Sequence, residues 1–207
     1  MKKILKWGCV GLLAVILFFV AFGIKAKVFP DKPSLSKARL NEAKAFCEAQ
    51  GFSTNRAVFV DYGAAFNSKR LLVVDLNTGK TLYRCMALRG LGNAKSWMKR
   101  FGNTPESNLT SLGKYRVGIR RMMRTINGLV SVEGLGIPCY ELWGLEESNS
   151  NAHRRGILLH GYVDSFVSAF FPAYTAGCIA VANKDFPVVG KYIKEADKPV
   201  LLWAYKD

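Results

Sequence analysis

Two side chains near the carboxyl end of the chain have the chemistry of an acyl-transfer site. His160 follows the apolar run 157–159, and Cys178 stands in the segment TAGCIAV directly after Gly177. An imidazole within hydrogen-bond reach of a thiol lowers the thiol pKa and keeps a thiolate, the species that attacks acyl carbons. Glycine beside such a nucleophile permits a tight turn that aims backbone N–H groups at one point, as an oxyanion hole requires. These residue types predict covalent catalysis by Cys178 with His160 as its base.

The same residues also fit a purely structural interpretation. Free cysteine is among the most buried residue types, and CIAVA has the composition of an apolar strand. His160 would then be a strand-end histidine, and His153, in NAHRRG, a solvated loop residue. On residue types alone both interpretations stay open.

Other chemistries lack their sequence patterns. The two histidines are not arranged in HExxH, and no CxxC is present, so no metal site is expected. The chain also lacks GxxxxGK[ST], a strand-associated GxGxxG and GxSxG, so we expect neither a nucleotide cofactor nor a serine nucleophile.

The elements that would position the pair are mostly short strands. A serine-capped helix is predicted to end at Gly51, and Pro187 fits the first turn of a second helix that begins after Asn183 or Asp185 and continues to Glu195. Many short strands with two modest helices predict a mainly β (α+β) domain, a sandwich or barrel. The predicted strands are 57–62, 70–76, 81–88, a strand from 115, 129–132, 140–145, 156–161 and 200–205, with a hairpin turn at 77–79 and a long polar connection at 101–118 that is typical of a functional loop.

The amino-terminal segment predicts export. MKKILK precedes the uncharged residues 7–24, and such a length lies at the short end of a membrane-spanning helix. We expect residues 1–27 to be an uncleaved inner-membrane anchor with the domain facing the periplasm, or a signal peptide cleaved near 21–23. Residues 28–53 then form a linker and helix, and 54–207 the catalytic domain.

Charge and cysteine content bear on partners and redox state. Lys and Arg number 30 against 15 acidic residues, a net charge of +15, which favours an anionic partner. An export signal without a basic run disfavours nucleic acid. Thiols outside the cytosol tend to form disulfides, yet sequence assigns no bridge among Cys47, Cys85 and Cys139.

The order of motifs resembles the murein L,D-transpeptidase catalytic domain family. ILLHGY and the later TAGCIAV resemble its His-Gly and [Ser/Thr]-x-Gly-Cys signature. FVDYGAAFNSKRLLVVDLNTGKTL, SLGKYRVG, YELWGLE, Asn149, RRGILLHG and KPVLLWAY are similar to its other segments in order, so the resemblance covers about residues 55–205.

The resemblance implies a role for each matching residue. Cys178 would attack a peptide carbonyl of a peptidoglycan stem and form a thioester. His160 would be its base and acid, oriented by the backbone carbonyl of Gly161. The amides of Gly177 and Cys178 would bind the oxyanion.

The resemblance assigns fewer residues to the substrate pocket. Thr175 and Tyr162 would line it, and Arg155 could meet a substrate carboxylate or be solvated. Ala176 and Ala180 depart from the commoner pattern, which indicates a divergent branch.

The implied protein is a monomeric L,D-transpeptidase without a cofactor, built from mixed sheets with two or three peripheral helices. Its partners would be peptidoglycan stem peptides and the inner membrane, the latter through residues 7–24. Two alternatives stay open: hydrolysis of the same acyl-enzyme, which makes a carboxypeptidase or a murein amidase or endopeptidase, and an inactive wall-binding module.

Overall fold

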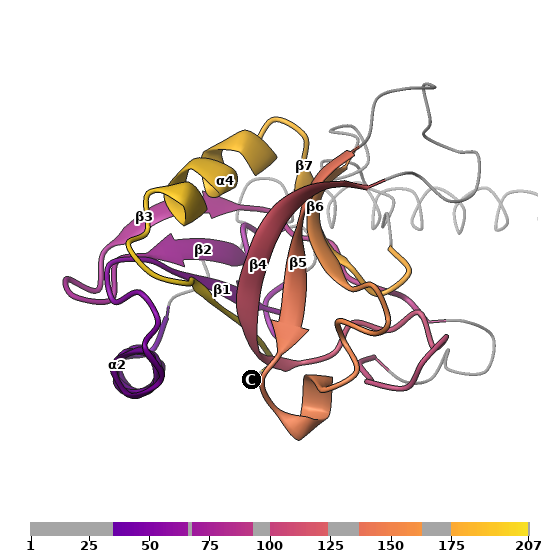
Figure 1. The fold of residues 1–207 in the computed structure, drawn as a ribbon, viewed down its shortest axis with the longest axis horizontal. Helices are drawn as coiled ribbons and strands as arrows, with labels where there is room; N and C mark the ends of the chain where they lie inside the picture. The colour runs from indigo at the N-terminus through magenta and orange to yellow at the C-terminus, as the bar shows by residue number, and fades with distance from the viewer. Residues whose placement is uncertain (1–34, 66–67, 93–99, 124–136, 163–174, 207) are drawn as a thin grey trace, which may run out of the picture.

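The described part of the protein is built around one curled β-sheet (Figure 1). The computed structural model describes residues 35–65, 68–92, 100–123, 137–162 and 175–206. The sheet has eight strands in the order β3-β2-β1-β8-β4-β5-β6-β7. Their bounds are β1 Ala57–Asp61, β2 Leu71–Val74, β3 Thr81–Cys85, β4 Gly113–Met123, β5 Ile137–Gly144, β6 Leu158–Tyr162, β7 Ile179–Ala182 and β8 Leu201–Tyr205.

The sheet is mixed and nearly closed. β1 pairs with β8, and β6 with β7, in parallel, while the other neighbours are antiparallel. The segment after edge strand β3 meets the other edge strand, because Leu88 and Ala180 form a bridge in which the Leu88 N–H lies 2.7 Å from the Ala180 carbonyl. This contact covers part of the β7 edge, which would otherwise present unpaired backbone groups. The mainly β prediction is confirmed, with one curled sheet in place of two packed sheets.

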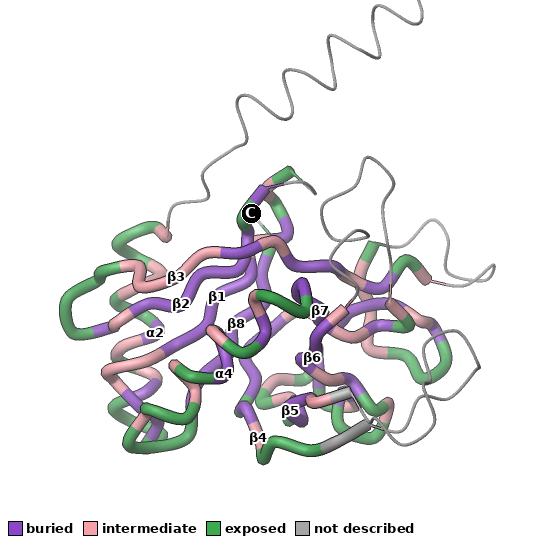
Figure 2. The backbone as a smooth tube through the Cα atoms, turned by 90° about the horizontal axis from the view of Figure 1, so that it is seen from above, coloured by how far each residue is buried: buried purple, intermediate pink, exposed green. Residues whose placement is uncertain are grey.

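Two helices cover opposite faces of β1, β2 and β8. Helix α2 (Lys37–Gln50) packs on one face through Ala43 and Cys47, and helix α4 (Phe186–Lys194) on the other through Phe186 and Val189. These strands are therefore buried on both sides, and Figure 2 shows them as continuous buried runs. Double burial explains their unbroken apolar sequences. A single 3₁₀ turn follows β5 at Glu147–Asn149.

The helix ends follow the capping signals in the sequence. Ser36 caps α2 by accepting a hydrogen bond from the Arg39 N–H at 3.2 Å, and Gly51 ends it with φ 70°. Asp185 precedes α4, with Pro187 in its first turn. Both predicted helices are confirmed.

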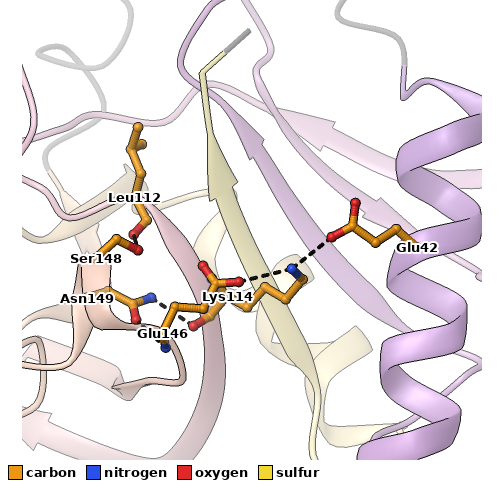
Figure 3. A network of polar contacts seen from close by, with 6 residues as sticks. All are labelled: Glu42, Leu112, Lys114, Glu146, Ser148 and Asn149. Carbon is orange, nitrogen blue, oxygen red and sulfur yellow. Dashed lines mark hydrogen bonds and ion pairs between the residues drawn. The ribbon is translucent and has the colours of Figure 1, made fainter.

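Helix α2 is fastened to the sheet by a buried lysine (Figure 3). The Lys114 ammonium on β4 lies 2.9 Å from a carboxylate oxygen of Glu42 on α2 and 2.9 Å from one of Glu146 after β5. It also lies 4.0 Å from the centre of the Trp203 ring. One cation therefore joins the helix, two strands and the connection after β5.

The remaining predictions from the sequence concern the amino-terminal segment, one further strand and the cysteines. The predicted strand 129–132 and the predicted anchor 1–27 lie outside the described residues. Within the described ranges, no helix is long and apolar enough to cross a membrane. The four cysteines of these ranges, Cys47, Cys85, Cys139 and Cys178, are free thiols, the first three buried.

Candidate active site

His160 lies in β6 with its ring fixed by its own strand. Its Nδ1 is 2.6 Å from the Gly161 carbonyl oxygen. A carbonyl can only accept, so Nδ1 carries the hydrogen and Nε2 of the neutral ring keeps its lone pair. The geometry thus contains the histidine–carbonyl contact that the family resemblance implies.

The surroundings of His160 favour the neutral ring. Its neighbours across β6 are Cys139 on β5 and Ala180 on β7. Burial lowers the pKa of His160, and the bond to Gly161 offsets this only in part. A Cβ added to Gly161 would collide with the Asn183 side chain, which would have to move to admit it.

Cys178 stands at the end of a hydrogen-bonded turn that starts at Thr175. The Thr175 hydroxyl donates to the Cys178 carbonyl at 2.6 Å and accepts from the Gly177 N–H at 3.3 Å. Gly177 has φ +113°, where a side chain would be strained. Thr175 therefore shapes the turn and engages the Gly177 amide, which the sequence analysis assigned to an oxyanion hole.

Cys178 is neither fully buried nor fully exposed. Burial raises its pKa to about 11. Its Sγ lies 3.7 Å from the Gly156 carbonyl, which an S–H can use as an acceptor. Burial therefore opposes the lowering of the thiol pKa that the sequence predicts from a neighbouring histidine.

The parallel pairing of β6 and β7 brings Cys178 close to His160 along the chain direction of the sheet. His160 is in register with Ala180, and Cys178 precedes Ala180 by two residues. From strand spacing and rise, the Cα atoms of His160 and Cys178 are about 8 Å apart. The fold therefore brings the backbones of the two residues close together, with His160 in β6 and Cys178 directly before β7.

Tyr162 is on the same side of β6 as His160. Its ring centroid is 6.3 Å from that of His160, and it packs against Leu88, Ala180 and Ala182. Ala180 is fully buried, so the alanine at this position fits the close approach of Leu88. The connection 163–174 lies outside the described residues.

Sequence reasoning missed two residues that support the turn. The Thr110 hydroxyl donates to the Gly177 carbonyl at 2.9 Å and accepts from the Gly90 N–H at 2.8 Å. A Cβ at Gly90 would meet the Gly177 backbone at 2.6 Å. The long polar connection 101–118 is typical of a functional loop, but its sequence does not single out Thr110.

Arg155, predicted to meet a substrate carboxylate or to be solvated, makes hydrogen bonds within the protein. Its two terminal nitrogens donate to acceptors of the protein itself. All four acceptors lie in the loop 102–111, which contacts the nucleophile turn. The neighbouring Arg154 is exposed and donates to Asn151 at 3.0 Å.

Residues 32–205 match the family described as L,D-transpeptidase catalytic domain. No curated protein sequence gives a significant match.

Similar solved structures include an L,D-transpeptidase of Xylanimonas cellulosilytica, with 16% identity and TM-score 0.43 over 78% of this chain and 68% of that one. An L,D-transpeptidase from Mycobacterium smegmatis has 12% identity and TM-score 0.42 over 73% and 58%. The helical cell shape determining protein of Campylobacter jejuni has 18% identity and TM-score 0.43 over 79% and 55%. The chain spans little more than half of the last two structures.

Proposed function

Because the chain belongs to the L,D-transpeptidase catalytic domain family, we propose that it is a cysteine acyltransferase that cross-links or modifies peptidoglycan stem peptides. The observation that carries the proposal is the contact of His160 Nδ1 with the Gly161 carbonyl, on the strand beside Cys178. That contact leaves Nε2 with a free lone pair, as a base requires.

The first half-reaction needs a coupled proton transfer, because the thiol has a raised pKa. Nε2 of His160 takes the thiol proton as Sγ of Cys178 bonds to the peptide carbonyl carbon of the donor stem. The tetrahedral intermediate then collapses: the C–N bond breaks, His160 gives the proton to the leaving amine, and a thioester remains.

The oxyanion of this intermediate needs N–H donors near the thiol. The amide of Cys178 is one candidate in the turn. The Gly177 amide is the second, and it would exchange its long 3.3 Å bond to Thr175 for the stronger interaction with a charged oxygen. Tyr162 lies beside His160 and would contact the bound stem.

The second half-reaction regenerates the enzyme. A neutral amine of a neighbouring stem attacks the thioester, passes its proton to His160, and the proton returns to sulfur as the C–S bond breaks. Water in place of the amine gives the hydrolytic alternative, a carboxypeptidase or amidase. Both outcomes use the same acyl-enzyme, so the acceptor decides between them.

The proposed setting is the inner membrane, with the domain facing the periplasm. Residues 7–24 would anchor the chain, and its charge of +15 would favour the anionic wall and membrane surface. The +15 charge acts on any anionic surface, so the wall substrate is supported by family membership and the site, not by charge.

Incubating the purified protein with defined muropeptides tests the proposal. New cross-linked dimers, resolved by mass, would support transfer, whereas shortened stems alone would support hydrolysis. We expect Cys178→Ser to abolish the thioester adduct while its melting temperature stays within a few degrees of wild type, because the change is nearly isosteric. Buried Cys47→Ser serves as the matched control and should keep the adduct. If the folded wild-type protein forms neither product, the proposal is contradicted and a wall-binding module is favoured.

A further inference from the structure

The nucleophile turn 175–178 is held from outside by two other segments. The Thr175 N–H donates to the Arg89 carbonyl at 3.2 Å, and Gly90 pairs with Thr175. From the other side, Thr110 of the loop 102–111 binds the Gly177 carbonyl. The position of the thiol therefore depends on that loop.

Arg155 fixes the loop 102–111 with a forked set of hydrogen bonds. Nη1 donates to the Gly102 carbonyl and the Ser111 hydroxyl, each at 2.9 Å. Nη2 donates to the Leu109 carbonyl at 2.5 Å and the Ser107 hydroxyl at 3.3 Å. A planar guanidinium can make four such bonds from one fixed position, which a lysine cannot.

The same guanidinium lies against the nucleophile turn. A Cβ on Gly177 would be 3.2 Å from Nη2 of Arg155, so the charge packs directly against the residue before Cys178. Its four acceptors are all neutral, and within the described ranges no carboxylate forms an ion pair with it. A half-buried cation without a carboxylate partner leaves its field available to a nearby developing anion.

We propose that Arg155 is a positioning residue that locks the loop 102–111 against the nucleophile turn and supplies the positive charge that stabilises the Cys178 thiolate as it forms. This inference rests on the proposed function only for its effect on acyl transfer. The effect on thiol reactivity is independent of the substrate.

Electrostatics agree in direction with this geometry. The charge of Arg155 acts to lower the pKa of Cys178, against the larger effect of burial. An opposite charge within about 6 Å favours the ionised form of a group. Removing the charge therefore shifts the thiol further toward its protonated form.

The test measures alkylation of Cys178 by iodoacetamide from pH 6 to 11, followed by mass on the peptide that contains it. Arg155→Gln keeps hydrogen-bond donors and loses the charge, and we expect alkylation at pH 8 to slow by about tenfold, one unit in thiol pKa. Arg154→Gln is the matched control, because Arg154 is exposed, and its profile should equal wild type. An unchanged profile in a folded Arg155→Gln would overturn the charge role.

Arg155→Lys separates charge from positioning. The lysine keeps the cation and loses the fork, so alkylation should stay within about threefold of wild type while acyl transfer falls by about tenfold or more. Transfer at the wild-type rate would overturn the positioning role. If Arg155→Gln fails to fold, the test rests on Arg155→Lys alone. An equal loss of alkylation and of acyl transfer in Arg155→Lys would then count against the proposal.

The two proposals fail in different ways. Wild-type protein that forms no product from muropeptides would contradict the function, and the alkylation comparison would still decide the role of Arg155.

Discussion

At the level of single residues, the protonation states of His160 and Cys178 set the pH dependence. Burial lowers the pKa of His160 below its usual 6.5, so the imidazole stays neutral, and able to act as a base, into mildly acidic solution. We expect kcat/KM to hold between pH 6.5 and 8 and to fall only as pH drops through this lowered pKa. A pH–rate profile with a defined stem peptide checks this, and an acidic limb centred above pH 7 would contradict it.

Residue types predicted the pair but not its ionisation. The histidine, the glycine after it and the cysteine could be identified from their motif order, including the Gly161 contact. The raised pKa of the Cys178 thiol could not be predicted, because it comes from burial, and burial arises from strands distant in sequence. The structural role of Arg155 was hidden for the same reason: its four acceptors lie 44 to 53 residues earlier in the chain.

At the level of elements, the close packing of the segment 88–91 against the nucleophile turn gives a sharp prediction. A Cβ on Gly90 would collide with the Asn108 carbonyl and the Gly177 backbone, which are not flexible side-chain ends. We expect Gly90→Ala to reduce acyl transfer by at least about tenfold, because a misplaced nucleophile loses attack geometry. Initial rates and thermal melting, measured together, check this.

Gly51→Ala is the control for that experiment. Gly51 has φ +70° and open space around it, so its alanine variant carries backbone strain of about 1 kcal/mol without touching the site. It should lose a little stability and keep its transfer rate. Equal rates in the two variants would show that the segment 88–91 does not position the thiol.

The contacts of Lys114 lead to a prediction of how much this residue contributes to stability. Lys114→Met removes two charged hydrogen bonds and a cation over Trp203, and should lower the free energy of unfolding by about 2 kcal/mol. The control is Lys191→Met, since Lys191 is exposed and lies 3.8 Å from Glu195; its effect should be within about 0.5 kcal/mol. Urea unfolding midpoints compare them, and equal midpoints would contradict the prediction.

Local sequence patterns predicted the helices and strands but not the order of the strands in the sheet. Ser36, Gly51 and Pro187 predict helix ends because capping is a contact between near neighbours in sequence. β8 lies between β1 and β4, and its pairing with β1 joins segments about 140 residues apart, for example Ala57 with Leu201. The hydrophobic periodicity of the sequence does not predict this pairing. The loop 102–111 likewise gains its role only when Arg155 folds against it.

At the scale of the whole molecule, near-closure of the sheet links the fold to the site. β7 carries the residues after Cys178, and the segment after β3 covers its outer edge through the Leu88–Ala180 bridge. The turn 175–178 is thereby enclosed between β6 on one side and the segment 88–91 on the other. The segment after edge strand β3 therefore meets edge strand β7 beside the turn that carries the proposed nucleophile, Cys178.

The amino-terminal segment and the charge make separable predictions for the full chain. Removing residues 1–27 deletes five lysines and no acidic residue, which leaves 25 basic against 15 acidic residues, a net charge of +10. We expect the full chain to stay with membranes in 1 M salt, because apolar insertion is not screened, whereas the 28–207 protein should bind anionic vesicles or sacculi at low salt and be released by about 0.3 M. Membrane flotation across a salt series measures both. Release of the full chain by salt would contradict the anchor, and salt-resistant binding of the shorter protein would show that its attachment is not electrostatic.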